Sequence, residues 1–286
     1  MSIREQVLNR IPEIPSLPVA TAQVLNLAQN PESGISDIMR VIEFDPGLTS
    51  DILRLANTAY FAGPRQVSSL REAGVLFGVE RIVELVLASS VFPIAKNSVE
   101  GYDLPPGELI RHAMALAIGS EQLAVVLERP APDHTFTAAL LADIGKLVLG
   151  SFIKVDAEPI LELARAEQLS FEVAERRILG IDHAEVGAQL LHTWNLPEKV
   201  IDVVRWHHDP DQLPGDKYVV DLVHVAHHLS IGCGFGIGLD GLNYRPSPEA
   251  CKRLGVNHRI LEQTTCNMVA MLTEMKHQLP AQGDGA

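Results

Sequence analysis

The sequence predicts an all-α protein, and three features support that class. Almost every segment places apolar residues at spacings of three and four, the period of an amphipathic helix. No segment shows a convincing alternation of apolar and polar residues, which would indicate a half-buried strand. Aromatic residues make up only 5% of the chain, whereas alanine, leucine and valine are abundant. This composition suits helices packed on helices.

The N-terminal part of the chain is predicted to form short helices separated by proline and glycine. Pro18 stands near the start of the first of these helices. Pro46 directly follows Asp45, which is the usual arrangement of an N-cap residue and the first helical position. A later apolar stripe begins at Leu70 and is interrupted by Gly78.

A polar break then divides the chain. Residues 96–107 include two adjacent prolines, which is typical of a linker. We therefore predict an N-terminal helical subdomain at 1–105 and a second subdomain, with a C-terminal helical extension, at 106–286. Asp182 and Glu185 have the spacing of a capping box. Helices of the second subdomain are expected over residues 108–127, 134–152, 157–167, 170–179, 184–194, 197–208, 217–230 and 256–277.

Charge and cysteine content restrict the function classes. The net charge is −13, from 36 acidic and 23 basic residues, whereas a nucleic-acid-binding protein normally has a basic face. Bulk nucleic-acid binding is therefore not expected. Three widely spaced cysteines indicate no disulfide framework, so we expect a reducing, cytoplasmic location. We expect no membrane span, because no apolar run appears long enough and the most apolar stretch, 140–153, contains Asp143 and Lys146.

The chain has eleven histidines, and several follow apolar helical stripes. His207 continues one such stripe, and His224, His227 and His228 share one side of a helix. Asp143 lies in a strongly apolar helix, where a charge needs a partner or a metal. Taken singly, each histidine is more often a hydrogen-bonded or surface residue. Their joint placement favours a metal site, because helical metal sites take imidazole and carboxylate ligands from several helices.

Other chemical signals are weaker. The glycine-rich segment 232–241 lacks a preceding strand and a following Gly-Lys-Ser/Thr, so we interpret it as a plain connection. No signature of Ser-His-Asp or Cys-His catalysis occurs in the sequence. Lys146 could contact a phosphate, but its spacing from Asp143 favours a helical ion pair three residues apart.

Several short motifs follow one another between residues 12 and 230. They are Leu17-Pro18, Asp-Pro-Gly-Leu at 45–48, Leu53 to Asn57, ALLADIGKLVL, and GIDHAEVGAQLLHTWNLPEKVIDVVRWHH. In this order they resemble the HDOD family, the HD-related output domains of bacterial signalling proteins. The resemblance implies an HD-superfamily-like helical bundle with an N-terminal helical subdomain. It also implies kinship with the HD phosphohydrolases, including the HD-GYP cyclic-dinucleotide phosphodiesterases.

The resemblance further implies a candidate metal site. In the HD enzymes a His-Asp doublet binds divalent metal, which activates water to attack phosphorus. The positions that match these motifs are His112, Asp143, His183, His207, His208 and His227, the last where an aspartate is usual. The doublet's histidine is Ala142 here, and the GYP signature is missing. No cofactor is then required, although one divalent ion of zinc, iron, nickel or manganese would suit the remaining ligands. We expect these groups to share one pocket, with Ala142 and Asp143 bordering it from one helix.

The sequence supports two candidate functions. The broken doublet favours a non-catalytic bacterial signal-transduction module that binds signalling proteins or a small ligand such as a nucleotide. The surviving histidines and Asp143 favour the alternative, a metal-dependent phosphohydrolase or phosphodiesterase acting on a nucleotide or cyclic dinucleotide. We prefer the first on the chemistry of the site, because a fold shared with enzymes does not by itself give activity.

Overall fold

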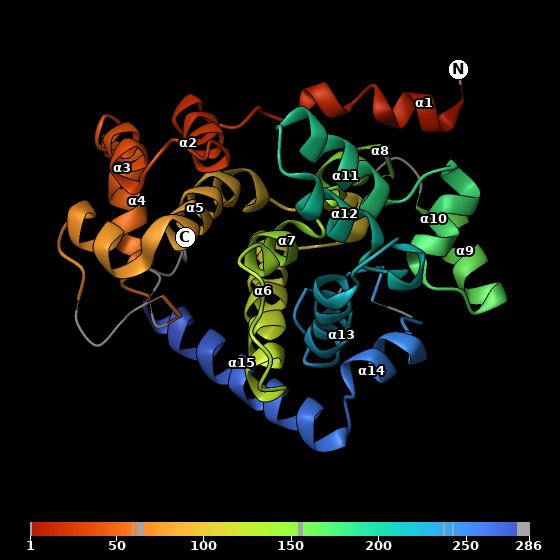
Figure 1. Cartoon of the computed structure of the whole chain (residues 1–286). Helices are drawn as coiled ribbons and strands as arrows, with labels where there is room; N and C mark the ends of the chain where they lie inside the picture. The colour runs from red at the N-terminus through yellow and green to blue at the C-terminus, as the bar shows by residue number, and fades with distance from the viewer. Residues whose placement is uncertain are drawn as a thin grey trace. The chain divides into compact units, whose positions relative to one another are not determined.

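The computed structural model describes residues 2–58, 60–61, 66–153, 157–236, 238–241 and 243–278. These residues form helices and connecting loops (Figure 1), and they contain no strand beyond an isolated bridge between Val99 and Leu104. The all-α prediction is therefore confirmed.

By its internal contacts the chain divides into two compact units. One comprises Met1–Ser16 and Ile94–Asn267, and the other comprises Leu17–Pro93 and Met268–Ala286. The subdomains that we expected at 1–105 and 106–286 stay a prediction.

The unit around Leu17–Pro93 is built from short helices whose ends follow the local signals. Its helices are α2 (Val19–Gln29), α3 (Ile35–Glu43), α4 (Pro46–Ala56) and most of α5 (Leu70–Ala95). Asp45 caps α4 by accepting a hydrogen bond from the backbone N–H of Leu48 at 3.0 Å. Gly78 has φ +72° and breaks the regular helical geometry of α5, as predicted. The Asn57 side chain joins the end of α4 to Val67 through hydrogen bonds with its N–H and C=O, each 2.8 Å.

The other unit contains the candidate ligands. Its helices are α1 (Ile3–Leu8), η1 (Ile11–Glu13), η2 (Glu100–Tyr102), α6 (Glu108–Val126), α7 (Thr135–Leu141), α8 (Lys146–Ile153), α9 (Glu158–Glu167), α10 (Phe171–Leu179), α11 (His183–Thr193), α12 (Glu198–Trp206), η3 (Pro210–Gln212), α13 (Tyr218–Gly232), α14 (Pro248–Leu254) and the start of α15 (His258–Gln278). Asp182 caps α11 by accepting from Glu185 N–H at 2.8 Å. The Glu185 carboxylate pairs with Arg4 of α1, at 2.6 Å, in place of completing the capping box.

The prediction of one helix over 134–152 is wrong. The segment forms α7 and α8, and residues 142–145 make a turn between them. The reason is a close approach: a Cβ added to Gly145 would lie 1.9 Å from the backbone oxygen of His183, at the start of α11. The turn that carries Ala142 and Asp143 is therefore pressed directly against another helix.

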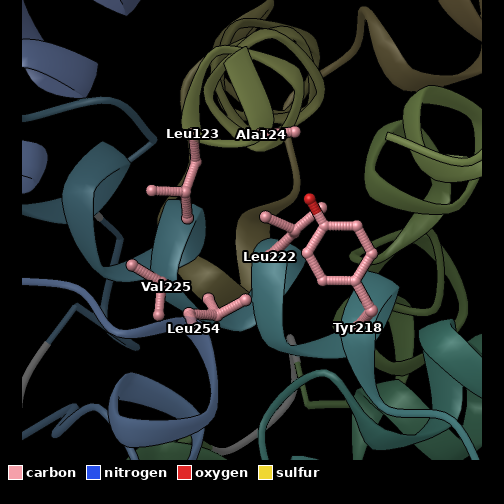
Figure 2. Close-up of a cluster of buried hydrophobic side chains, with 6 residues drawn as sticks. All are labelled: Leu123, Ala124, Tyr218, Leu222, Val225 and Leu254. Carbon is pink, nitrogen blue, oxygen red and sulfur yellow. The ribbon is translucent and has the colours of Figure 1, made fainter. Parts of the chain in front are cut away.

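Helix α6 runs through the core of this unit between α7 and α13, and it packs against both. Figure 2 shows one part of that core, where Leu123 and Ala124 of α6 face side chains of α13 and Leu254 of α14. The six residues of this cluster are all buried: Leu123, Ala124, Tyr218, Leu222, Val225 and Leu254. Helices α6 and α13 each supply a candidate ligand, so this packing fixes two of the imidazoles relative to one another.

Two segments of this unit, Glu108–Val126 and Thr135–Ile153, are long and apolar enough to cross a membrane by length and composition alone. The expectation that no apolar run reaches that length is wrong for them. In the described structure, 67% and 83% of their most apolar windows are buried, as is common for core helices. Their apolar character is thus explained by packing inside the protein.

Candidate metal centre

The structure brings all six predicted site residues together, and Asp143 lies at their centre. Its Oδ2 atom lies 2.9 Å from His112 Nε2 and 3.6 Å from His227 Nε2. Its Oδ1 atom lies 3.3 Å from His183 Nε2 and 3.7 Å from His207 Nε2. Three helices and the C-cap of α12 therefore direct four imidazole nitrogens toward the one carboxylate that the turn carries.

His208 completes the group from the loop after α12. Its ring centroid lies 3.9 Å from that of His207, and its Nε2 lies 2.8 Å from His183 Nε2. Tyr244 stacks on His208 at 5.0 Å between centroids and 15° between planes. The His208 ring therefore contacts two aromatic rings, with its Nε2 at the cluster.

Hydrogen bonds from the far side of the rings orient three of these histidines. The Nδ1 atom of His112 lies 2.9 Å from the Phe235 carbonyl oxygen, and that of His207 lies 2.7 Å from the Val204 carbonyl oxygen. A carbonyl oxygen only accepts, so each Nδ1 carries a proton, and in the neutral form of the ring Nε2 then presents a lone pair. His183 likewise directs Nδ1 to the Glu175 carboxylate at 2.8 Å. Metal-binding histidines are commonly oriented in this way.

The lone pairs left at the centre have no hydrogen-bond partner among the described residues. These buried atoms are Nε2 of His112, His207 and His227 and both carboxylate oxygens of Asp143. The Nε2 atoms of His207 and His227 lie 3.7 Å and 3.6 Å from Asp143, beyond hydrogen-bond distance, and the closer His112 Nε2 makes no hydrogen bond with it either. Buried polar atoms are normally paired, so a convergent unpaired set needs an explanation. A cation at their meeting point supplies one.

The donor set fits one transition metal ion. Asp143, His207, His208 and His227 each offer a ligand atom, and these four atoms all lie within 4.8 Å of one another. Three imidazoles and a carboxylate suit zinc, iron, nickel or manganese. His112 and His183 border this group. Ala142 is fully buried in the turn and offers no donor. The assignment of the six residues as metal ligands stays a prediction.

The ammonium group of Lys146 also lies beside Asp143. Its Nζ lies 3.1 Å from Asp143 Oδ2, which confirms the ion pair predicted from their spacing. The same Nζ lies 2.6 Å from Asp240 Oδ2, and the side chains of Lys146 and Asp240 are only 2% and 3% exposed. Asp240 comes from the glycine-rich segment 232–241, so this connection also has a structural role. It supplies a buried carboxylate to the cluster.

The electrostatics favour neutral imidazoles around a charged carboxylate. Burial opposes ionisation of Asp143, but the charge of Lys146 and the contact with His112 hold its pKa well below the usual value. Burial lowers the pKa of His208 and of His227 well below the usual histidine value. Both rings are therefore neutral at pH 7, which is the form that binds metal.

The pKa of His183 shifts in the opposite direction, because the buried Glu175 carboxylate contacts its Nδ1 atom. Burial lowers its pKa, but the charge of Glu175 and the contact with Asp143 outweigh this and raise it to about 10. Glu175 also accepts from the His183 backbone N–H at 3.0 Å and from the Tyr102 hydroxyl at 2.5 Å. Without a metal, His183 is thus an imidazolium that donates from Nδ1 to Glu175, while its Nε2 lies 2.8 Å from His208 Nε2.

Sequence reasoning missed Glu175, Asp240, Tyr102 and Tyr244. Tyr102, Asp240 and Tyr244 act on residues far along the chain, as Tyr102 acts on Glu175 across 73 positions, and Glu175 acts on His183 eight positions away, in the next helix. Periodicity within one helix gives no signal for such contacts. The single available cue was Asp240, an acidic residue within a glycine-rich segment.

The comparisons agree with this fold. The family profile of the HDOD domain matches residues 14–210, so the chain belongs to the HDOD family. A crystal structure named "Putative phosphohydrolase" from Shewanella amazonensis is 26% identical, with a TM-score of 0.71, and covers 96% of this chain and 97% of its own. An HDOD domain protein from Geobacter sulfurreducens is 21% identical, with a TM-score of 0.70, and covers 97% of this chain and 99% of its own. This similarity shows that the two proteins share a fold.

A curated relative from Treponema pallidum, named "Uncharacterized protein", is 25% identical over 224 residues. The match covers 77% of this chain but only 42% of that protein. The chain therefore spans less than half the length of this relative.

Proposed function

We propose that this protein is a cytoplasmic bacterial signal-transduction module that acts by binding a partner protein or a small ligand, and that its His/Asp cluster can hold one metal ion in a structural role. Membership of the HDOD family supports the signalling context. The cluster supports the structural role, because its central side chains are enclosed.

The observation that carries this proposal is the burial of five of the six site side chains, with His208 partly buried. The side chains of Asp143, His112, His183, His207 and His227 are each 3% exposed or less. A catalytic metal site keeps an open coordination position for water or substrate. Here Lys146 lies against Asp143, and Ala142 stands in place of one ligand of the HD doublet. Both features favour binding over hydrolysis.

A second candidate function is a metal-dependent phosphohydrolase. The unpaired Nε2 atoms beside Asp143 favour it, as does the name of the Shewanella amazonensis protein. A bound divalent ion would lower the pKa of a water molecule and so supply a nucleophile. The residues of this chain would hold and orient that ion.

Turnover measurements separate the two functions. Protein purified without a histidine tag is incubated with bis(p-nitrophenyl) phosphate and with a cyclic dinucleotide, in the presence of Mn²⁺, Fe²⁺ or Mg²⁺. We expect no hydrolysis above that of Asp143→Ala, with the exposed Asp133→Ala as a matched control. A melting temperature that rises with the cyclic dinucleotide, without its consumption, would support small-ligand binding. Hydrolysis that is lost in Asp143→Ala and kept in Asp133→Ala would establish the phosphohydrolase.

A further inference from the structure

We propose that His224, which is not one of the candidate ligands, is a positioning residue for the metal centre: its ring joins the backbone of the His207–His208 pair to helix α13, which carries His227. This inference rests on the proposed capacity of the cluster to hold a metal. It identifies the contact that fixes three of the four donor groups relative to one another.

Both ring nitrogens of His224 make hydrogen bonds. Its Nδ1 lies 2.7 Å from the carbonyl oxygen of His207, and its Nε2 lies 2.8 Å from the backbone nitrogen of Ser247. A carbonyl oxygen only accepts and an amide N–H only donates, so Nδ1 carries the one ring proton and Nε2 accepts. Burial lowers the pKa of His224 to about 4, which agrees with this neutral form of the ring.

The bond to His207 acts on the peptide unit between two donors. His207 is the C-cap residue of α12, and the last carbonyls of a helix have no partner within the helix. Because a peptide unit is planar, a hydrogen bond to the His207 carbonyl orients the unit that joins His207 to His208. Helix ends otherwise fray. The positions of these two donors therefore depend on His224.

Helix α13 supplies the other end of this connection. His224 and His227 lie three residues apart, so they are neighbours on the helix surface. The Nε2 atom of His227 lies 3.6 Å from Asp143 Oδ2. Within one helical turn the backbone geometry is fixed. The bond from His224 to the end of α12 thus sets the distance between that end and His227.

The Nε2 atom of His224 holds a second segment beside the cluster. Ser247 is the N-cap of α14 and follows shortly after Tyr244, whose ring stacks on His208 at 5.0 Å between centroids. The Ser247 hydroxyl also donates to the Asp211 carboxylate at 2.7 Å. His224 is therefore fixed on one side to the end of α12 and on the other to the segment that carries Tyr244.

The competing explanation is that His224 only satisfies buried backbone groups and has no effect on metal binding. His224→Phe keeps a planar ring and removes both hydrogen bonds. His224→Asn keeps an N–H donor near the place of Nδ1 and so preserves the bond to the His207 carbonyl. His224→Gln keeps an acceptor near the place of Nε2 and loses that bond.

Two controls lie on the same helix. His228→Phe changes a histidine one turn further along α13, whose ring makes no hydrogen bond among the described residues. Val225→Ala removes a buried side chain of the cluster in Figure 2, which lowers the stability of α13 packing without removing a hydrogen bond of His224.

Each tag-free protein is stripped with a chelator and titrated with Zn²⁺ by calorimetry. We expect His224→Phe to bind Zn²⁺ about 10- to 100-fold more weakly than the wild type, as when a group that orients a ligand is removed. His224→Asn should recover most of this loss, and His224→Gln should not. Val225→Ala should melt at a lower temperature than the wild type, yet Val225→Ala and His228→Phe should both keep the wild-type affinity.

NMR spectra of the imidazole groups in the metal-free proteins give a second readout. The ring signals of His207 and His208 should shift in His224→Phe and return toward their wild-type positions in His224→Asn. The inference is overturned if folded His224→Phe has the wild-type affinity, or if His224→Asn and His224→Gln lose affinity equally, a comparison that also decides if His224→Phe does not fold. If the wild type binds no Zn²⁺, the proposed metal role fails, and unshifted ring signals in the His224 variants then overturn this inference separately.

Discussion

Replacement of Gly145 by alanine tests how the turn that carries Asp143 is held against α11. A Cβ at this position would lie 1.9 Å from the His183 carbonyl oxygen and 2.5 Å from the Gly187 backbone nitrogen. Both neighbours are backbone atoms, which cannot rotate away as a flexible side chain could. Ordinary contacts begin near 3.4 Å, so the turn and the start of α11 must separate by more than about 1 Å.

The expected cost follows from the overpacking. Extra methyl groups in packed cores cost about 1–3 kcal/mol, and occasionally more. Because this clash involves backbone atoms at the start of a helix, we expect a loss at the upper end of that range, about 3 kcal/mol of unfolding free energy. For a protein of this size 1 kcal/mol shifts the melting temperature by about 2–4 °C, so we expect a fall of roughly 6–12 °C. Because His183 moves with the start of α11, metal affinity should fall by about tenfold or more.

Thermal unfolding followed by circular dichroism, together with zinc calorimetry, measures both effects. Gly232→Ala is the matched control, because a Cβ there meets nothing within 4 Å and the residue ends helix α13. That variant should melt within about 2–4 °C of the wild type, as a change below 1 kcal/mol implies. If Gly145→Ala also melts within that interval and binds zinc like the wild type, the close approach of the turn to His183 is refuted.

The remaining predictions concern the ligands and the pH dependence. Ala142→His should raise the affinity for Zn²⁺ or Mn²⁺ by restoring an imidazole beside Asp143; a variant that melts lower and binds no better would show that the fully buried site is closed. Glu175→Gln should lower metal affinity about 10- to 100-fold by removing the carboxylate behind His183, and unchanged calorimetry would contradict this. Burial raises the pKa of Glu172 to about 7, against an ordinary value of 4.5. The wild type therefore loses stability as pH rises from 4.5 to 7, so the stability of Glu172→Gln relative to the wild type should increase over that range. The exposed control Glu162→Gln should show no such increase in melting temperature relative to the wild type.

The sequence by itself determined the helical class and several helix boundaries. The cap formed by Asp45 before Pro46 and the interruption at Gly78 both occur as predicted. Signals of this kind act within one or two turns of the chain, so they can be interpreted locally. The ordered motifs identified the family, and they named Asp143 and the five histidines that the fold brings to its carboxylate.

Tertiary packing decided the local structure around that carboxylate. The apolar pattern of residues 134–152 favours one continuous helix, yet contact between Gly145 and the start of α11 imposes a turn at Ala142 and Asp143. Similarly, Asp182 and Glu185 have the spacing of a capping box. The Glu185 carboxylate instead pairs with Arg4, which is 181 positions away. In both cases a contact distant in sequence outweighed a weak local preference.

Tertiary structure also decided which charges accompany the histidines. The spacing of Lys146 from Asp143 predicted their ion pair, but nothing local connects Lys146 with Asp240 or His183 with Glu175. A buried charge takes its partner from whichever helix or loop packs against it, because desolvation makes an unpaired charge costly wherever its partner lies in the chain. Periodicity specifies which face of a helix is buried, and only the packing of the helices specifies what that face meets.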